Sequence, residues 1–217
     1  MSSPEKPEPH PQPDRIDSVA LPMHILKAEF RLFRIHKSFG RDNQKRGAIY
    51  FDRSNQSRFN STAGEYGVLY AGSDSYVAFR ETSRVYSNTP IALDFLAPNC
   101  LSVLYPERDL RLVDLSGGGL TLIGADARLT TGVYSLSQAW SKALYNHADR
   151  VDGLYYRSRY DPSRFCVALY DGRVNPAELK EERVTENNLL DRSFEPELQQ
   201  ILDEYGYQRD DDDNPEI

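Results

Sequence analysis

The sequence predicts an α+β fold with a largely antiparallel or mixed sheet and a few flanking helices. Many short segments have the apolar composition or the two-residue alternation of β-strands, and a few longer ones have a helical period. The two kinds of segment do not alternate regularly along the chain, as they would in a doubly wound fold. The mixture therefore favours an α+β architecture.

The expected strands are short and are separated by Gly, Pro, Asn and Asp. In the first, residues 29–35, strict alternation puts one arginine among apolar residues on each face, Arg31 on one and Arg34 on the other. The remaining expected strands are residues 48–51, 68–72, 100–105, 110–115, 120–124, 152–156 and 165–170.

Helical periodicity predicts three helices. In residues 73–86, either Ser73 or Asp74 can cap the N-terminus. In residues 135–149, one side of the helix carries Trp140, Ala143, Leu144 and His147. The third helix is expected at residues 195–206.

Composition limits the class of protein. A chain of 217 residues fits one domain, and 14 Tyr with 9 Phe can supply an aromatic core. The net charge of −7 argues against a nucleic-acid partner, because such a surface neutralises phosphates with basic side chains. The chain has neither an apolar run of about 20 residues, as a membrane helix needs, nor a secretory signal, so we expect a cytoplasmic location. Cys100 and Cys166 lie in apolar contexts, which predicts buried free thiols.

The two ends of the chain are expected to be tails. Residues 1–18 carry five prolines among charged and polar neighbours and cannot bury enough apolar surface to offset chain entropy. Residues 206–217 contain four consecutive aspartates, whose repulsion opposes compaction; a divalent-metal site there is the alternative. The ordered domain is therefore expected to span residues 26–205.

Three polar residues, Arg34, Glu81 and Ser158, stand where the surrounding pattern predicts an apolar side chain. A buried charge is costly unless it is paired or binds a ligand, so these residues are candidates for a functional site. Glu81 and Ser158 also have ordinary structural interpretations.

Glu81 lies on the apolar stripe of its helix, because Val77, Glu81 and Val85 are spaced at i, i+4 and i+8. The alternative is a surface glutamate paired with Arg80 or Arg84. Periodicity alone does not separate these interpretations.

Ser158 follows Leu154 and Tyr156 on one face of a strand, at the end where a cleft-facing side chain could contact a ligand. The alternative is a serine whose hydroxyl binds a backbone group of the following turn, which is the commoner role beside the sequence DPS.

Taken together, these segments resemble a known family, the RES domains, named for their Arg, Glu and Ser. The resemblance rests on LFRIH around Arg34, on RFN at residues 58–60, on VLYAGSDSYVAFRE and on AWSKALYNHADRVDGLYYRS, and it extends from about Phe30 to Tyr170. The chain departs from the family at QSRFN, where many members carry glycines before Arg58, so the backbone of that loop can differ.

The resemblance implies an ADP-ribosyltransferase-like fold and an enzyme that consumes NAD. Such enzymes cleave the nicotinamide–ribose bond by phosphorolysis or hydrolysis, several as bacterial toxins that a partner antitoxin holds inactive. Inorganic phosphate is accordingly a candidate co-substrate, and an antitoxin with a helix-turn-helix domain is a family-level expectation.

The residue types suit this chemistry. Glu81 could stabilise the positive charge of an oxocarbenium-like transition state or orient the ribose. Arg34, Arg58 and Ser158 could bind phosphate oxygens. Tyr70 could stack on nicotinamide or hydrogen-bond the ribose, although a buried tyrosine is as often part of the core.

Other classes of site have weaker support. His36 and His147 lack metal-ligand spacing, so no metal is predicted. SGGGLTLIG, residues 116–124, lacks the Walker lysine and is expected to form a tight turn between strands. Two alternatives to an NAD-degrading enzyme remain, a protein ADP-ribosyltransferase of the same fold and a catalytically silent interaction module. The sequence also leaves homo-oligomerisation open.

Overall fold

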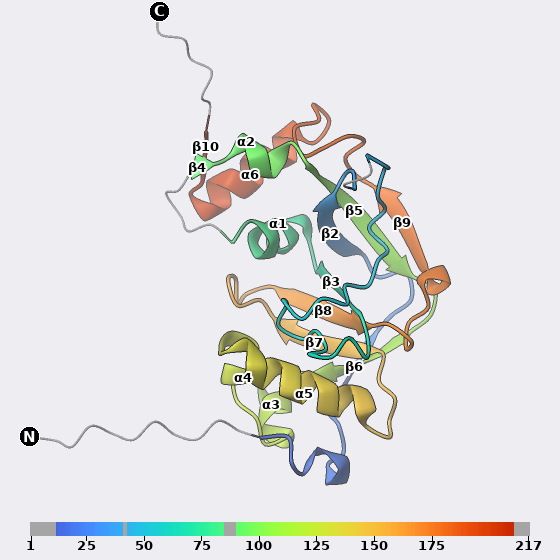
Figure 1. Ribbon diagram of the computed structural model, residues 1–217. Coiled ribbons are helices and arrows are strands. Elements are labelled where there is room, and N and C mark those ends of the chain that lie inside the picture. Colours follow the sequence, from blue (N-terminus) through green and yellow to red (C-terminus); the bar gives the residue numbers. More distant parts are fainter. Residues whose placement is uncertain (1–11, 41–42, 85–89, 211–217) are drawn as a thin grey trace, which may run out of the picture.

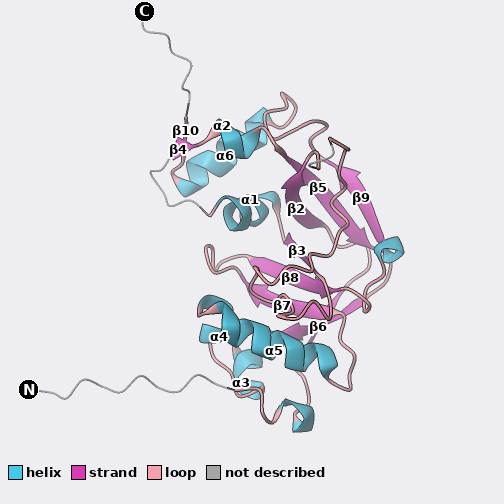
Figure 2. Cartoon of the chain, in the orientation of Figure 1, coloured by secondary structure: helices cyan, strands magenta, loops and turns pink. Residues whose placement is uncertain are grey.

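The fold is built on one curled sheet, as the computed structural model shows for residues 12–40, 43–84 and 90–210 (Figures 1 and 2). The strand order is β1-β6-β7-β8-β3-β2-β5-β9, and every neighbouring pair is antiparallel except β6 and β7. The strands are β1 (Met23–Leu26), β2 (Leu32–Lys37), β3 (Val68–Gly72), β5 (Asn99–Pro106), β6 (Leu110–Asp114), β7 (Gly153–Arg157), β8 (Phe165–Tyr170) and β9 (Leu179–Arg183). Two further strands, β4 (Pro90–Ile91) and β10 (Gln208–Arg209), form a parallel pair.

Helices lie at two ends of the sheet (Figure 1). One group, α3 (Gly118–Leu122), α4 (Arg128–Thr131) and α5 (Tyr134–Asn146), lies against β6, β7 and β8. The other, α1 (Ser75–Ser83), α2 (Leu93–Leu96) and α6 (Glu195–Tyr205), lies beside β2 and β5. Short 3-10 turns occur at η1 (Ile16–Ser18) and η2 (Pro176–Glu178). The three predicted helices correspond to α1, α5 and α6, and Asp74 is the N-cap of α1.

Alternation along the strands divides the interior into three apolar clusters. Val68 of β3 packs with Trp140 of α5 in the first cluster, whereas its neighbour Leu69 packs in a second, formed mainly by strands inside the curl of the sheet. The third cluster joins Phe79 of α1 and Ile201 of α6 to the sheet. The aromatic core expected from composition is present, and both cysteines are buried and free.

The first expected strand begins later than predicted. β2 starts at Leu32, and Arg31 precedes it on the surface with its guanidinium 5.0 Å from the centre of the Phe33 ring. Arg34 is in the strand and is buried. The predicted alternation therefore holds from Leu32 onward, and of the two arginines only Arg34 is enclosed.

Two expected strands are wrong. Residues 48–51 run beside the sheet without pairing, because their polar groups are bound otherwise: the Ala48 N–H donates to Glu181 Oε2 (2.8 Å) and the Tyr50 carbonyl accepts from Arg34 (3.0 Å). Residues 120–124, expected to be a strand after a tight turn, belong largely to α3. There Leu120 and Ile123 are buried at helical spacing while the intervening Leu122 is 66% exposed, which is incompatible with strand alternation.

Core residues lie outside the expected domain limits, residues 26 and 205, at both ends of the chain. Ile16 packs in the first apolar cluster, ahead of residue 26, and Tyr207 packs in the third, beyond residue 205. The tail predictions otherwise fall largely on residues 1–11 and 211–217, which lie outside the described residues. No helix in the described ranges is long and apolar enough to span a membrane.

Candidate active site

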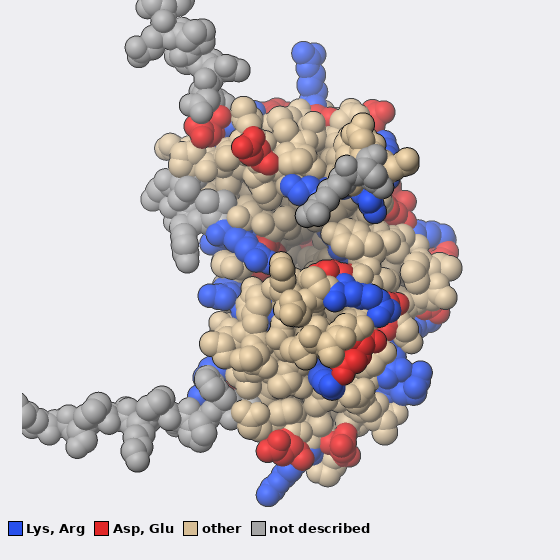
Figure 3. Space-filling view, in the orientation of Figure 1, with Lys and Arg blue, Asp and Glu red and all other residues tan. Residues whose placement is uncertain are grey.

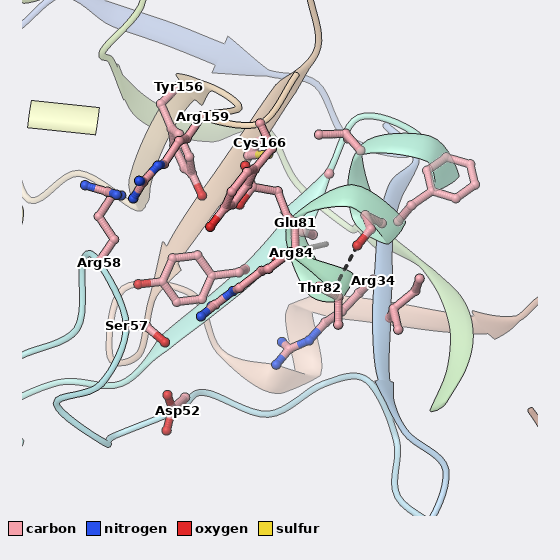
Figure 4. Close-up of a pocket in the computed structure, with 18 of the residues that line it drawn as sticks. Arg34, Asp52, Ser57, Arg58, Glu81, Thr82, Arg84, Tyr156, Arg159 and Cys166 are labelled. Carbon is pink, nitrogen blue, oxygen red and sulfur yellow. Dashed lines mark hydrogen bonds between the residues drawn. The ribbon is translucent and has the colours of Figure 1, made fainter. Parts of the chain in front are cut away.

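A pocket of about 470 Å³ opens between α1 and the loop that follows β7 (Figures 3 and 4). Its floor follows the seam where β2 and β3 are joined at Phe33 and Gly72. Charged side chains from four parts of the chain line it: Arg34, Asp52, Arg58, Glu81, Arg84 and Arg159. Four guanidinium groups thus face two carboxylates, so the pocket is locally basic in a protein of net charge −7.

Glu81 and Ser158 are in direct contact. The Ser158 Oγ donates to Glu81 Oε1 at 2.6 Å, and it accepts from the backbone N–H groups of Tyr160 (3.1 Å) and Asp161 (3.0 Å). A hydroxyl has one proton, and the two amides occupy its acceptor positions, so that proton points to Glu81. The turn interpretation of Ser158 is therefore confirmed, and the same hydroxyl also holds the Glu81 carboxylate.

The two residues have different access to the pocket. Glu81, near the C-terminal end of α1, lines it, whereas Ser158 is 2% exposed and stands behind the carboxylate. The partner of the Glu81 side chain is Ser158, which lies on the turn after β7. The carboxylate is thus oriented from one side and open to the pocket on the other.

Arg34 lies at the floor of the pocket and is 7% exposed. Its Nη1 donates to the Tyr50 carbonyl (3.0 Å), and its guanidinium stands 4.1 Å from the centre of the Tyr50 ring. Burial lowers the pKa of Arg34, and contacts with Tyr50 and the charges of Asp52 and Glu181 oppose that shift. Tyr50, in the segment of residues 48–51 that does not pair with the sheet, therefore covers this arginine.

Arg58 is held across the opposite wall. Its Nη1 donates to the Gly132 carbonyl (2.8 Å) and to Ser137 Oγ (3.1 Å), and its guanidinium lies 4.8 Å from the centre of the Tyr134 ring. These contacts connect the RFN segment to the start of α5.

Tyr70 holds the RFN segment, residues 58–60, through its hydroxyl group. Its hydroxyl accepts from the Phe59 N–H (2.8 Å) and donates to Asn60 Oδ1 (2.9 Å), and burial raises the pKa of the phenol. Asn60 in turn donates to Asp52 (2.7 Å), whose pKa stays low despite burial because Ser54 and Asn60 hydrogen-bond it. The ring of Tyr70 lines the pocket while its hydroxyl is engaged with the loop.

Two arginines of the pocket lining, Arg84 and Arg159, were not among the site residues predicted from the sequence. Arg84 ends α1 in the left-handed conformation (φ 54°), and Arg159 is exposed in the polar turn after β7, so neither interrupts an apolar pattern. The RSR sequence after a strand was the available signal for Arg159.

A second polar group lies on the same face of β2 as Arg34. His36 is buried and contacts Ser102 Oγ (3.0 Å), which donates to Glu181 Oε1 (2.8 Å). Burial lowers the pKa of His36 to about 4. His147 lies apart from this group, at the C-terminal end of α5. The described ranges contain no cluster of three or more His, Cys, Asp or Glu side chains able to hold a metal ion.

Comparison with known proteins identifies the family. A model of the RES domain family matches residues 31–191, which is most of the chain. The chain belongs to the RES domain family. Among solved structures, this RES domain is similar to one chain of the crystal structure of the M. tuberculosis MbcT–MbcA toxin–antitoxin complex. That match has a TM-score of 0.55 at 14% identity and covers 84% of this chain and 91% of that one. A comparison with curated proteins found no match.

The structural match concerns the fold. The curled mixed sheet with few helices confirms the predicted α+β class, and the chain of the solved complex shares this overall fold. Residues 31–191 of the RES domain contain each of the lining side chains described above.

Proposed function

We propose that this RES domain consumes NAD by cleaving the bond between nicotinamide and ribose. The observation that carries the proposal is the placement of the Glu81 carboxylate, held by Ser158, in a pocket that is also lined by four arginines. A volume of about 470 Å³ falls within the range of ligand pockets, roughly 300–1,000 Å³. NAD carries both features that such a lining would recognise, an anionic pyrophosphate and a sugar that becomes cationic as the bond breaks.

Glu81 is the residue assigned to the reacting sugar. As nicotinamide departs with the bonding electron pair, C1 of the ribose gains positive charge, which a nearby carboxylate stabilises more strongly than it stabilises the ground state. Ser158 acts through Glu81 by holding one carboxylate oxygen at 2.6 Å. It is therefore a positioning residue in this proposal.

The arginines are assigned to anionic groups. A planar guanidinium donates two parallel hydrogen bonds to phosphate oxygens, which suits the pyrophosphate or an incoming inorganic phosphate. Arg58 and Arg34 keep the roles that the sequence predicts, with Arg34 restricted by its contacts to Tyr50. The ring of Tyr70 is available for stacking from the pocket wall.

The acceptor is proposed to be inorganic phosphate, with water as the alternative. In phosphorolysis a phosphate oxygen forms the new bond to C1 of the ribose as nicotinamide leaves, giving nicotinamide and a ribose-phosphorylated ADP-ribose. In hydrolysis a water oxygen forms the bond to C1 instead and one of its two protons is released to solvent, giving free ADP-ribose. No metal or further cofactor is assigned.

The biological role is proposed to be that of a toxin paired with an antitoxin. The support is membership of the RES domain family and the fold shared with a chain of a solved toxin–antitoxin complex. An antitoxin with a helix-turn-helix domain and a cytoplasmic site of action are parts of this proposal. Growth arrest on expression, relieved when a candidate antitoxin is co-expressed, would support it.

Mass spectrometry of the products tests the chemistry. Purified protein is incubated with NAD, with and without phosphate, beside Glu81→Gln. We expect release of nicotinamide by the wild type, a ribose phosphate adduct when phosphate is present, and loss of release in the variant. Unchanged NAD under both conditions would refute the proposal and favour a silent interaction module. Adenine-labelled NAD that leaves label on protein would instead indicate a protein ADP-ribosyltransferase.

A further inference from the structure

Two of the pocket arginines, Arg58 and Arg159, lie close together. Figure 4 shows their side chains reaching toward one another from different parts of the chain, Arg58 from the RFN loop and Arg159 from the turn after β7. Their proximity is electrostatically significant: burial lowers the pKa of Arg58, and the neighbouring positive charge of Arg159 lowers it further. The fold thus holds two like charges at one wall of the pocket.

The contacts of Arg58 leave part of its guanidinium available. Both of its hydrogen bonds, to Gly132 and Ser137, are made by Nη1. Stacking on Tyr134 fixes the plane of the group. In the described part of the chain Nε and Nη2 have no hydrogen-bond acceptor, so the planar fork retains donors for a ligand.

Arg159 is placed by the turn that Ser158 organises. The Ser158 hydroxyl accepts from the amides of Tyr160 and Asp161, which fixes the backbone on either side of Arg159. The guanidinium of Arg159 stands 5.5 Å from the centre of the Tyr160 ring. Across residues 12–40, 43–84 and 90–210, no carboxylate lies within ion-pair distance of it.

Other arginines of this protein are paired with carboxylates, unlike Arg159 within the described residues. Arg108 is paired with Asp152 and Glu178, and Arg164, in the same loop as Arg159, is paired with carboxylates that include Asp74. Ion pairs with carboxylates therefore neutralise arginines elsewhere in this fold, including Arg164 in the loop that carries Arg159. At Arg58 and Arg159 two guanidinium groups lie close together, and Glu81, an acidic residue of the pocket lining, is engaged by Ser158.

We propose that Arg58 and Arg159 together bind the phosphate oxygens of a ligand, with Arg159 as a specificity residue that the RES motif does not name. This inference rests on the proposed function. An anion between the two groups removes their repulsion and accepts from both forks. The shared chemistry is a phosphate group, supplied either by the pyrophosphate of NAD or by inorganic phosphate.

The test compares Arg159→Gln with Arg192→Gln, a matched loss of charge at an exposed arginine outside the pocket. Steady-state rates are measured against NAD at fixed phosphate, and against phosphate at fixed NAD. We expect Arg159→Gln to raise one KM by about tenfold, equivalent to about 1.4 kcal/mol. A rise in the KM for NAD assigns the pair to the pyrophosphate, and a rise in the KM for phosphate assigns it to the acceptor. If both KM values stay within about twofold of those of Arg192→Gln, the inference is overturned.

A binding measurement separates this inference from the proposed activity. Thermal unfolding is followed with inorganic pyrophosphate, with inorganic phosphate and with chloride at matched ionic strength. Stabilisation of the wild type by either phosphate compound, reduced in Arg159→Gln and retained in Arg192→Gln, supports the anion site even if NAD proves not to be a substrate. Equal responses of the two variants, or no response of the wild type to either compound, overturn it.

Discussion

Ser158→Ala tests whether this serine acts through Glu81 or by touching the ligand. The substitution removes a hydroxyl that makes three hydrogen bonds, one to the Glu81 carboxylate and two from the amides of Tyr160 and Asp161. The two roles predict different kinetics. A positioning residue lowers kcat and leaves the affinity for ligands nearly unchanged, whereas a contact to a phosphate raises KM.

The size of the effect follows from the hydrogen bond to a charged group. Such a bond contributes about 1.5–3 kcal/mol, so complete loss of the orientation of Glu81 lowers kcat about 30-fold at 2 kcal/mol. The two turn amides lose their acceptor at a site partly reached by water, and this lowers the free energy of unfolding by about 1–2 kcal/mol. For a chain of this length, we expect the melting temperature to fall by about 2–8 °C.

The assay is steady-state nicotinamide release at 25 °C, well below the melting temperature, with saturation curves for NAD and for phosphate. Ser163→Ala is the control, because Ser163 is exposed in the same turn and is absent from the pocket lining. Ser158→Thr keeps a hydroxyl and should recover part of kcat. An unchanged kcat with a KM for either substrate raised tenfold would refute the positioning role and favour direct contact with an anion.

Three further substitutions or conditions probe the surroundings of the site. Tyr70→Phe removes the hydroxyl that holds the loop of Arg58; we expect the free energy of unfolding to fall by about 1–3 kcal/mol and the KM for NAD to rise, measured by urea unfolding and steady-state rates. Gly153→Ala places a Cβ 2.2 Å from the Ala168 carbonyl oxygen; we expect a loss of about 2 kcal/mol or more in the same unfolding assay, and an unchanged urea midpoint would contradict this packing. Burial lowers the pKa of His36 to about 4, below its unfolded value of 6.5, so the unfolded state binds the proton first as the pH falls. We therefore expect the free energy of unfolding to fall by about 2 kcal/mol from pH 7 to pH 5. The substitution His36→Asn should flatten that pH dependence.

Strand positions could be predicted where alternate residues of a strand pack in different apolar clusters. β3 and β8 alternate between two apolar clusters, and their expected limits agree with the structure. Residues 48–51 have a similar composition, but the Ala48 amide is bound by Glu181 and the Tyr50 carbonyl by Arg34, both from distant parts of the chain. Composition does not encode that competition, so the strand prediction there was wrong.

The candidate site was predictable to the extent that a polar residue interrupts an apolar pattern. Arg34 and Glu81 do so, and both line the pocket. Arg159 does not, because its neighbours are polar and it is exposed in a turn. Only the fold brings it beside Arg58, so its candidacy depends on geometry that the sequence does not carry.

Ser158 is a turn residue that also contacts a residue of the pocket lining. The sequence offers a turn residue or a site residue as alternatives, and the commoner alternative is the turn. In the structure, the amides of the turn fill the acceptor positions of Oγ, and this is what directs its proton to Glu81. The same turn carries Arg159. A change in the backbone of this turn would therefore alter the orientation of the Glu81 carboxylate and the position of Arg159 together, and so would couple the residue proposed to act on the ribose to one proposed to bind phosphate.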